Sequence, residues 1–241
     1  DSDLCKTPSE DLKSVALSVE SVIQNLDKAA AYNQGKGGGP YRPERKWDVD
    51  LVRETVAQYE YYLKLFHAAK EASLDDDEQP SSKIRKLFLS PETTQHAFRA
   101  LLRCKTNTTE LSQKVRDWER YLGNLGETVL TDNLSLAMIQ TNGKAGNVGR
   151  TISLLALRKS RNFEPRESEF MHAITAIEAA GLFLRTNRNT FLSEKDQPQI
   201  DDPTRWLDAI LLNMSQRGFP LTTRVANRML NTYTTTGKSG K

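Results

Sequence analysis

Residues 144–181 read KAGNVGRTISLLALRKSRNFEPRESEFMHAITAIEAAG, and this stretch decides the fold. It begins with Lys144-Ala145-Gly146 and ends with Ala179-Ala180-Gly181, so a similar tripeptide recurs after 35 residues. Between the two glycines the sequence predicts a helix, a short turn and a second helix. A period in the mid-thirties that contains two helices is typical of stacked helical repeats, whose units bury their apolar faces against one another. We therefore expect an all-α array with an extended binding surface.

The composition permits nucleic-acid binding without demanding it. The chain has 241 residues, with 34 Lys and Arg against 31 Asp and Glu, and a formal net charge of +3. This mildly basic balance is far from that of a polycationic protein. Cys5 and Cys104 are far apart and form no metal-spaced cluster, which predicts reduced thiols. No apolar run reaches the ~20 residues of a membrane-spanning helix, so no membrane span is expected.

The region before Trp47 differs from the rest of the chain. A helical spacing of apolar residues predicts an amphipathic helix within residues 12–26. Residues 34–45 hold four glycines and two prolines, which is typical of a linker. We therefore expect residues 1–46 to form an N-terminal amphipathic helix with a Gly-rich linker, and residues 47–241 to form the helical-repeat array.

Helix signals recur throughout residues 47–241. Ser90-Pro91-Glu92-Thr93 predicts a helix N-terminus, with Ser90 as its cap. No segment alternates apolar and polar residues over a strand length, so we expect roughly nine to ten helices in antiparallel pairs over the whole chain. Tyr59, Tyr61 and Tyr62 lie on the first of these helices, and two interpretations stay open for them: core packing or stacking against bases.

One insertion interrupts the repeat period. Gly181 and Gly237 are 56 residues apart, which is one 35-residue unit and 21 further residues. We expect residues 182–202 to be a surface loop inserted into one repeat. The sequence ends after the first helix of a unit, so the array is expected to continue past Lys241.

The repeat unit resembles the pentatricopeptide repeat (PPR). Residues 148–181 are similar to the family consensus without a gap, and Asn162 stands where the family usually has glycine in the turn. Residues 207–237 give a second match and residues 131–146 a weaker one, while tetratricopeptide and other helical repeats remain alternatives. The resemblance implies a right-handed superhelical α-solenoid of antiparallel helix pairs, with the N-terminal helical extension described above.

The same resemblance implies RNA binding. Family members bind single-stranded RNA in mitochondria or plastids, and each repeat reads about one base with two or three side chains. Carried onto this chain, the reading positions are Leu136 with Arg166, Met171 with Thr222, and Asn227. Leu136 and Met171 cannot make the directional hydrogen bonds of such a code, whereas Asn227 can. The positions that would sandwich bases, Asn133, Ser168 and Arg224, also depart from the small apolar residues of the family.

Arginines on the first helices of the units could hold RNA through its phosphates. The candidate RNA-binding residues are Asn227, Arg224, Arg228, Arg166, Thr222, Arg99 and Arg103. The alternative is that these residues are solvated helix faces. If the protein binds RNA, Arg99, Arg103, Arg224 and Arg228 should lie along one concave stripe. If it is a scaffold, it should instead expose an apolar patch.

Two functions remain open. The first is an organellar RNA-binding protein, mitochondrial or plastid, that supports RNA stability, processing or translation. The second is a non-catalytic scaffold subunit of a large organellar assembly, for example a mitochondrial ribosome. The expected partners are accordingly single-stranded or ribosomal RNA and other protein subunits.

No enzyme, metal site or cofactor is expected. His67, His96 and His172 have no metal-ligand spacing and no neighbouring cysteines. The segment Arg166-Glu167-Ser168-Glu169 supplies carboxylates, which we expect at the surface.

Overall fold

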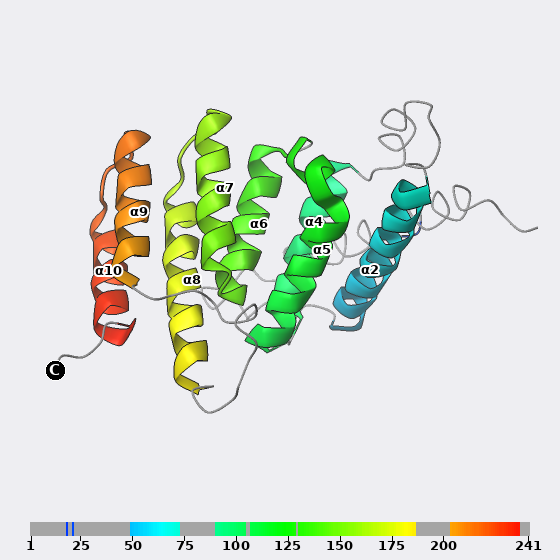
Figure 1. The fold of residues 1–241 in the computed structure, drawn as a ribbon, viewed down its shortest axis with the longest axis horizontal. Helices are drawn as coiled ribbons and strands as arrows, with labels where there is room; N and C mark the ends of the chain where they lie inside the picture. Colours follow the sequence, from blue (N-terminus) through cyan, green and yellow to red (C-terminus); the bar gives the residue numbers. More distant parts are fainter. Residues whose placement is uncertain are drawn as a thin grey trace, which may run out of the picture. The chain divides into compact units, whose positions relative to one another are not determined.

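The computed structural model describes five ranges of the chain, 49–72, 90–104, 107–128, 130–186 and 203–236, together with the helical residues Ser18 and Ser21. Within these ranges the protein has eight helices and no strand, which confirms the all-α fold class (Figure 1). The remainder of the predicted N-terminal helix and the predicted linker at 34–45 lie outside the described residues.

The helices fall into two compact units. In chain order they are α2 (Val49–Ala72), α4 (Pro91–Arg103), α5 (Thr108–Thr128), α6 (Asp132–Ala145), α7 (Val148–Ser160), α8 (Glu167–Thr186), α9 (Pro203–Gln216) and α10 (Thr223–Thr236). The first unit contains α2, α4 and the part of α5 from Arg116 onward. The second unit contains the start of α5 and all of α6 to α10. Most of the candidate RNA-binding residues belong to the second unit.

Aromatic side chains form the core of the first unit. The ring of Trp118 lies 4.7 Å from that of Tyr59 and 5.4 Å from that of Phe98, measured between centroids. Tyr59 and Tyr62 are fully buried, so these two tyrosines pack in the core, and Tyr61 alone of the three is exposed. Burial raises the pKa of the Tyr59 hydroxyl far above its usual range.

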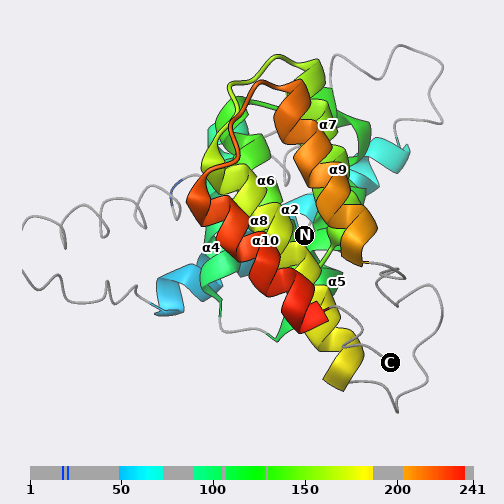
Figure 2. The same ribbon diagram turned by 90° about the vertical axis from the view of Figure 1, so that its left-hand side faces the viewer.

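The second unit is built from two layers of helices. Helices α6, α8 and α10 lie side by side in one layer, while α7 and α9 pack together in the other (Figure 2). Helix α8 occupies the middle, because it contacts α6, α7, α9 and α10. The apolar side chains of α8 that face these neighbours, including Phe170, Ile174 and Ile177, are fully buried. Burial of such faces between neighbouring helices stabilises the unit.

Residues in the left-handed conformation follow three of the helices. Gly146 follows α6 with φ of 74°, Asn162 follows α7 with φ of 54°, and Gly218 follows α9 with φ of 65°. In the latter two turns the next residue, Phe163 or Phe219, donates its N–H back to the preceding helix at 3.1 and 2.9 Å. This is the hydrogen-bond pattern of a Schellman cap, and asparagine is the residue that most often replaces glycine in it. Asn162 therefore adopts the left-handed conformation that glycine usually adopts at such a turn.

The recurrence of the glycine tripeptide does not correspond to a recurrence of structure. Gly146 ends α6, whereas Gly181 lies inside α8, which continues to Thr186. Residues 182–186, which were predicted to belong to a loop at 182–202, are therefore helical, and residues 187–202 lie outside the described residues.

Gly143 allows α6 and α8 to approach closely. A Cβ atom added at Gly143 would lie 2.5 Å from the backbone oxygen of His172 and 3.2 Å from its carbonyl carbon. Both contacts are with backbone, which cannot move without separating the helices. Partial burial of the His172 imidazole lowers its pKa, so that the neutral ring is favoured.

We predict that Gly143→Ala lowers the free energy of unfolding by about 1–3 kcal/mol, because the new methyl group overpacks the contact between α6 and α8. Gly149→Ala is the matched control, since Gly149 is an exposed residue of α7 with no atom within 4 Å of an added Cβ. The control should gain up to about 1 kcal/mol from helix propensity. Chemical denaturation of both variants measures the difference, and equal stabilities would contradict the close approach.

Candidate nucleic-acid interface

The helix starts in the α6–α8–α10 layer are linked by polar contacts. Thr131 caps α6 by accepting the N–H of Leu134 at 3.2 Å, and Asp132 follows as the first residue of the helix. Arg166, the residue before α8, forms an ion pair with Asp132. The Arg166 side chain is 41% exposed. This candidate RNA-binding residue therefore has an acidic partner on the neighbouring helix.

An equivalent contact links the starts of α8 and α10. Thr222, the residue before α10, caps this helix by accepting the N–H of Val225 at 3.3 Å. The Thr222 hydroxyl donates to one oxygen of Glu167 at 3.1 Å, and Arg224 donates to the other at 3.3 Å. The Arg224 side chain is 76% exposed. The structure thus brings two candidate residues together around one carboxylate.

A third contact lies one turn further along α10. Arg228 forms an ion pair with Glu178 of α8, and the Arg228 side chain is 41% exposed. The other oxygen of Glu178 accepts from the hydroxyl of Thr232 at 2.8 Å, and Thr232 is fully buried. Glu178 therefore joins α8 to α10 through one exposed and one buried partner.

The two remaining arginines belong to the first unit. Arg99 and Arg103 lie on α4, and both are half-buried. The amide oxygen of Gln95, when turned toward Arg99, accepts from its guanidinium group at 2.8 and 3.0 Å. The structure therefore divides the four predicted first-helix arginines between two units.

The residues at the three proposed base-reading positions differ in their exposure to solvent. Leu136 on α6 and Met171 on α8 are half-buried, while Asn227 on α10 is exposed. Of these three, only Asn227 offers a side-chain donor and acceptor to a base edge. Arg166 and Thr222, the second residues of the first two pairs, are engaged with Asp132 and Glu167. The arrangement can therefore supply cations for phosphates and some apolar area, with little hydrogen-bond readout of bases.

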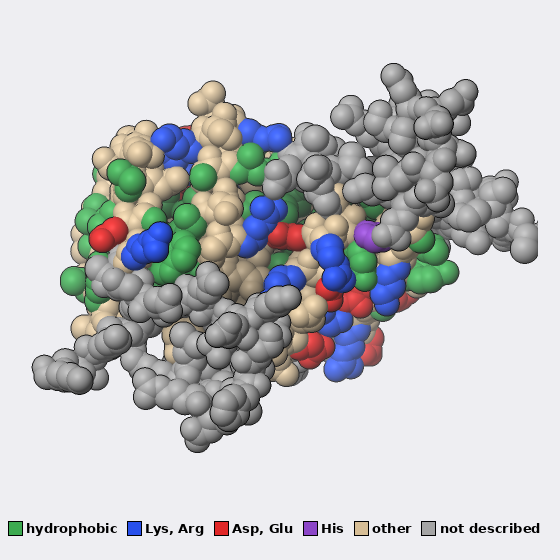
Figure 3. All heavy atoms as spheres, in the orientation of Figure 1, with side chains coloured by type: hydrophobic (Ala, Val, Ile, Leu, Met, Phe, Trp, Pro, Cys, Tyr) green, Lys and Arg blue, Asp and Glu red, His purple; other side chains and the backbone are tan. Residues whose placement is uncertain are grey.

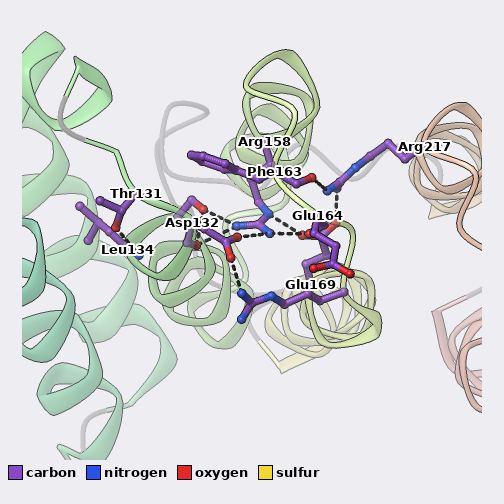
Figure 4. A network of polar contacts seen from close by, with 10 residues as sticks. Thr131, Asp132, Leu134, Arg158, Phe163, Glu164, Glu169 and Arg217 are labelled. Atoms are coloured by element: carbon purple, nitrogen blue, oxygen red, sulfur yellow. Dashed lines mark hydrogen bonds and ion pairs between the residues drawn. The ribbon is translucent and has the colours of Figure 1, made fainter.

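Sequence reasoning missed a buried ionic cluster next to these contacts. Arg158, at the end of α7, is fully buried between Asp132 of α6 and Glu169 of α8 (Figure 4). Arg217, which follows α9, reaches the other oxygen of Glu169 and donates to the carbonyl of Phe163 at 2.8 Å. We call Asp132, Arg158, Glu169 and Arg217 the ionic cluster. It joins four helices of the second unit.

Most N–H groups of the Arg158 guanidinium group have an acceptor. Nε donates to Glu169, and the terminal nitrogens donate to the carbonyl of Asp132 at 2.8 Å, to the hydroxyl of Ser135 and to the carbonyl of Glu164 at 3.1 Å. The carboxylate of Asp132 lies 2.6 Å away as an ion pair, so four hydrogen bonds and two carboxylates surround a group with five N–H donors. Such pairing is what allows a charge to be buried.

Glu169 corrects an expectation drawn from the sequence. The carboxylates of residues 166–169 were expected at the surface, but Glu169 is fully buried. Burial raises the pKa of its carboxyl group, while the adjacent guanidinium groups of Arg158 and Arg217 act in the opposite direction. The expectation is wrong because a prediction from residue types assigns every charged residue of a helix to the surface. The buried arginines that pair with Glu169 come from other parts of the chain, so they do not enter such a prediction.

A comparison between repeat units could have revealed the cluster. In the unit 56 residues later, Met214 occupies the place of Arg158 and Val225 the place of Glu169, and both are buried. A charged pair at two positions that are apolar in a sister repeat is a signal for a buried ion pair.

Two further properties concern the described part of the chain. It contains no group of three or more His, Cys, Asp or Glu residues arranged to hold a metal ion. Among its helices, none combines the length and the apolar character needed to cross a membrane.

No family model, curated protein or solved structure matches this chain. The assignment to pentatricopeptide repeats therefore stays a prediction from the repeat unit.

We predict that Arg158→Met lowers the free energy of unfolding by about 3–5 kcal/mol, because it leaves Glu169 buried with half of its charge partners. The double variant with Arg158→Met and Glu169→Val copies the residues of the later unit. It should lose less than the sum of the two single variants, with a coupling of about 1–3 kcal/mol. A double-mutant cycle measured by urea denaturation gives this value, and strictly additive losses would show that the pair does not interact.

Proposed function

We propose that this protein is a non-catalytic, organellar RNA-binding protein of the PPR type, which holds RNA mainly through its phosphates. In this proposal the helix pairs form a right-handed superhelical array, and the face of α6, α8 and α10 is the RNA-binding side. The organelle is the mitochondrion, with the plastid as the alternative. RNA binding of this kind would support the stability, processing or translation of its target.

The exposed arginines at the α8 and α10 helix starts carry this proposal. Arg166, Arg224 and Arg228 keep 41%, 76% and 41% of their side chains exposed while they line one helix layer. Arginine is well suited to phosphate because its planar donors match two oxygens at once. Helices α9 and α10 with the turn between them contain four arginines and a single acid, Asp208, so this segment carries a net positive charge.

Phosphate contacts are favoured over base readout for a chemical reason. Leu136 and Met171 offer no directional hydrogen bond at two of the three reading positions. Arg166, Arg224 and Arg228 are each paired with an acid, so the face of α6, α8 and α10 does not present one uncompensated basic field. A surface of this kind fits weak, salt-sensitive binding with little preference for sequence.

We predict that Arg224→Ala and Arg228→Ala each weaken the binding of a single-stranded RNA several-fold, by similar factors for oligonucleotides of unrelated sequence. Each lost phosphate contact should also reduce the slope of log K against log salt by about one unit. Arg205→Ala is the control, because Arg205 is exposed on α9, in the other layer. Fluorescence anisotropy at several salt concentrations measures these effects. A loss for only one RNA sequence would instead indicate base readout.

A second function, the scaffold subunit, is favoured by a different observation. Leu212, Leu221 and Leu230 are 58%, 53% and 62% exposed, and all lie on α9, on α10 or between them. Hydrophobic side chains are accordingly visible over this end of the unit (Figure 3). Exposed apolar side chains that gather on one face often mark a protein interface.

Crosslinking of the native protein, with joint recovery of bound RNA and co-purifying proteins, separates the two functions. One or a few short transcripts would support the RNA-binding protein. Ribosomal RNA with a fixed set of proteins would identify a subunit of an assembly that contacts RNA through phosphates. Recovery of proteins without RNA would support only the scaffold function.

A further inference from the structure

We propose that Glu167 sets the RNA affinity of this protein, because its carboxylate occupies the donors of Thr222 and Arg224 that a phosphate would use. This inference rests on the function proposed above. It adds a residue that acts against binding, and it places the exchangeable phosphate contact at the boundary between α8 and α10.

The Glu167 carboxylate has the position of a bound anion. One oxygen accepts from the Thr222 hydroxyl at 3.1 Å and the other from Arg224 at 3.3 Å. A hydroxyl and a guanidinium group that converge on two oxygens are also the donors that nucleic-acid phosphates receive in protein complexes. Glu167 and a phosphate therefore compete for the same two groups.

The contact is loose enough to be exchanged. Ionised donor–acceptor pairs normally lie about 2.7–2.9 Å apart, so the 3.3 Å between Arg224 and Glu167 is long. Arg224 is 76% exposed and Glu167 is 32% exposed, so water and salt screen their attraction. A phosphate in a polyanion approaches with more negative charge around it than one carboxylate supplies.

The other two acids that pair with the exposed arginines are held more firmly. Asp132 pairs with Arg166, but it also contacts the buried Arg158 at 2.6 Å. Glu178 pairs with Arg228, but it also accepts from the buried Thr232. In the described part of the chain, Glu167 contacts only Thr222 and Arg224 through its side chain, and neither of these is buried. Glu167 is thus the acid that can leave without breaking a buried bond.

Asp132 and Glu167 occupy equivalent positions in successive units but differ in how firmly they are held. Asp132 and Glu167 are 35 residues apart, and each accepts from the residue that precedes the next helix of the layer, Arg166 or Thr222. In the first pair the acceptor is tied to the ionic cluster. In the second pair the donor is an uncharged hydroxyl, and the cation is the exposed Arg224. The contact of Asp132 is therefore fixed by a buried partner, whereas the equivalent contact of Glu167 can exchange its partners.

The test compares Glu167→Gln with Glu164→Gln. Both substitutions remove one negative charge, but Glu164 is exposed in the turn before α8 and its side chain makes no contact with Arg224. With a mixed-sequence single-stranded RNA as the probe, Glu167→Gln should tighten binding about three- to tenfold at moderate salt, whereas Glu164→Gln should change it less than about twofold. Binding is measured by fluorescence anisotropy on the full chain.

Two more variants make the result specific. Glu167→Gln combined with Arg224→Ala should bind no more tightly than Arg224→Ala alone, because the competitor matters only while Arg224 is present. Glu167→Asp keeps the charge but shortens the side chain, so it should also tighten binding. This variant separates competition for Arg224 from a general change of charge, and it serves if the glutamine variant is unstable.

Each outcome of these measurements supports or overturns the role of Glu167. Equal affinities of Glu167→Gln and Glu164→Gln would overturn the role of Glu167, while a loss in Arg224→Ala would still support RNA binding. A gain from Glu167→Gln that persists in the Arg224→Ala background would also overturn it. Absence of RNA binding in every variant would overturn both this inference and the proposed function.

Discussion

The second unit depends on the burial of one charged side chain, that of Arg158. A guanidinium group removed from water destabilises the fold by several kcal/mol unless all of its donors are paired. The acceptors come from the start of α6, from the turn after α7 and from α8, and Arg217 completes the charge balance of Glu169. The ends of these helices must therefore meet at one point. The candidate interface is built on the same helix starts, so its geometry is set by this cluster.

The ionic cluster also distinguishes one repeat from the next. Neighbouring units of a repeat protein have similar apolar faces, and a slip of one unit against another would cost little if every contact were apolar. In such a slip Glu169 would face Met214, the residue that corresponds to Arg158 in the later unit. Its buried carboxylate would then lack Arg158 as a partner. Buried ionic groups can fix register in this way because unpaired charges destabilise the alternatives. We infer that the cluster keeps α7, α8 and α9 in their observed order of packing.

Much of the fold could be predicted from the sequence, and much less of the site. The helix start at Ser90 and the turns at Gly146, Asn162 and Gly218 follow from local chemistry, because caps and left-handed residues act within a few positions. The end of α8 could not be predicted, because a glycine is also tolerated inside a helix, and α8 continues beyond Gly181 to Thr186. The pairing of Arg228 with Glu178 and of Arg166 with Asp132 depends on neighbouring helices, and a single sequence does not specify such partners. For the same reason Glu169 was placed on the surface.

The acidic partners change how the arginines of the interface should be understood. A row of exposed arginines read from sequence suggests a basic stripe, but each arginine of the α8 and α10 starts has a carboxylate from the preceding helix of the layer. These pairs hold the layer together, and they also lower the electrostatic potential that attracts a polyanion. The acids that also have buried partners stay in place, but their arginines remain partly exposed and can still contact a phosphate. The affinity is therefore tuned at the pair that can exchange partners, at the boundary between α8 and α10, and not by the number of arginines alone.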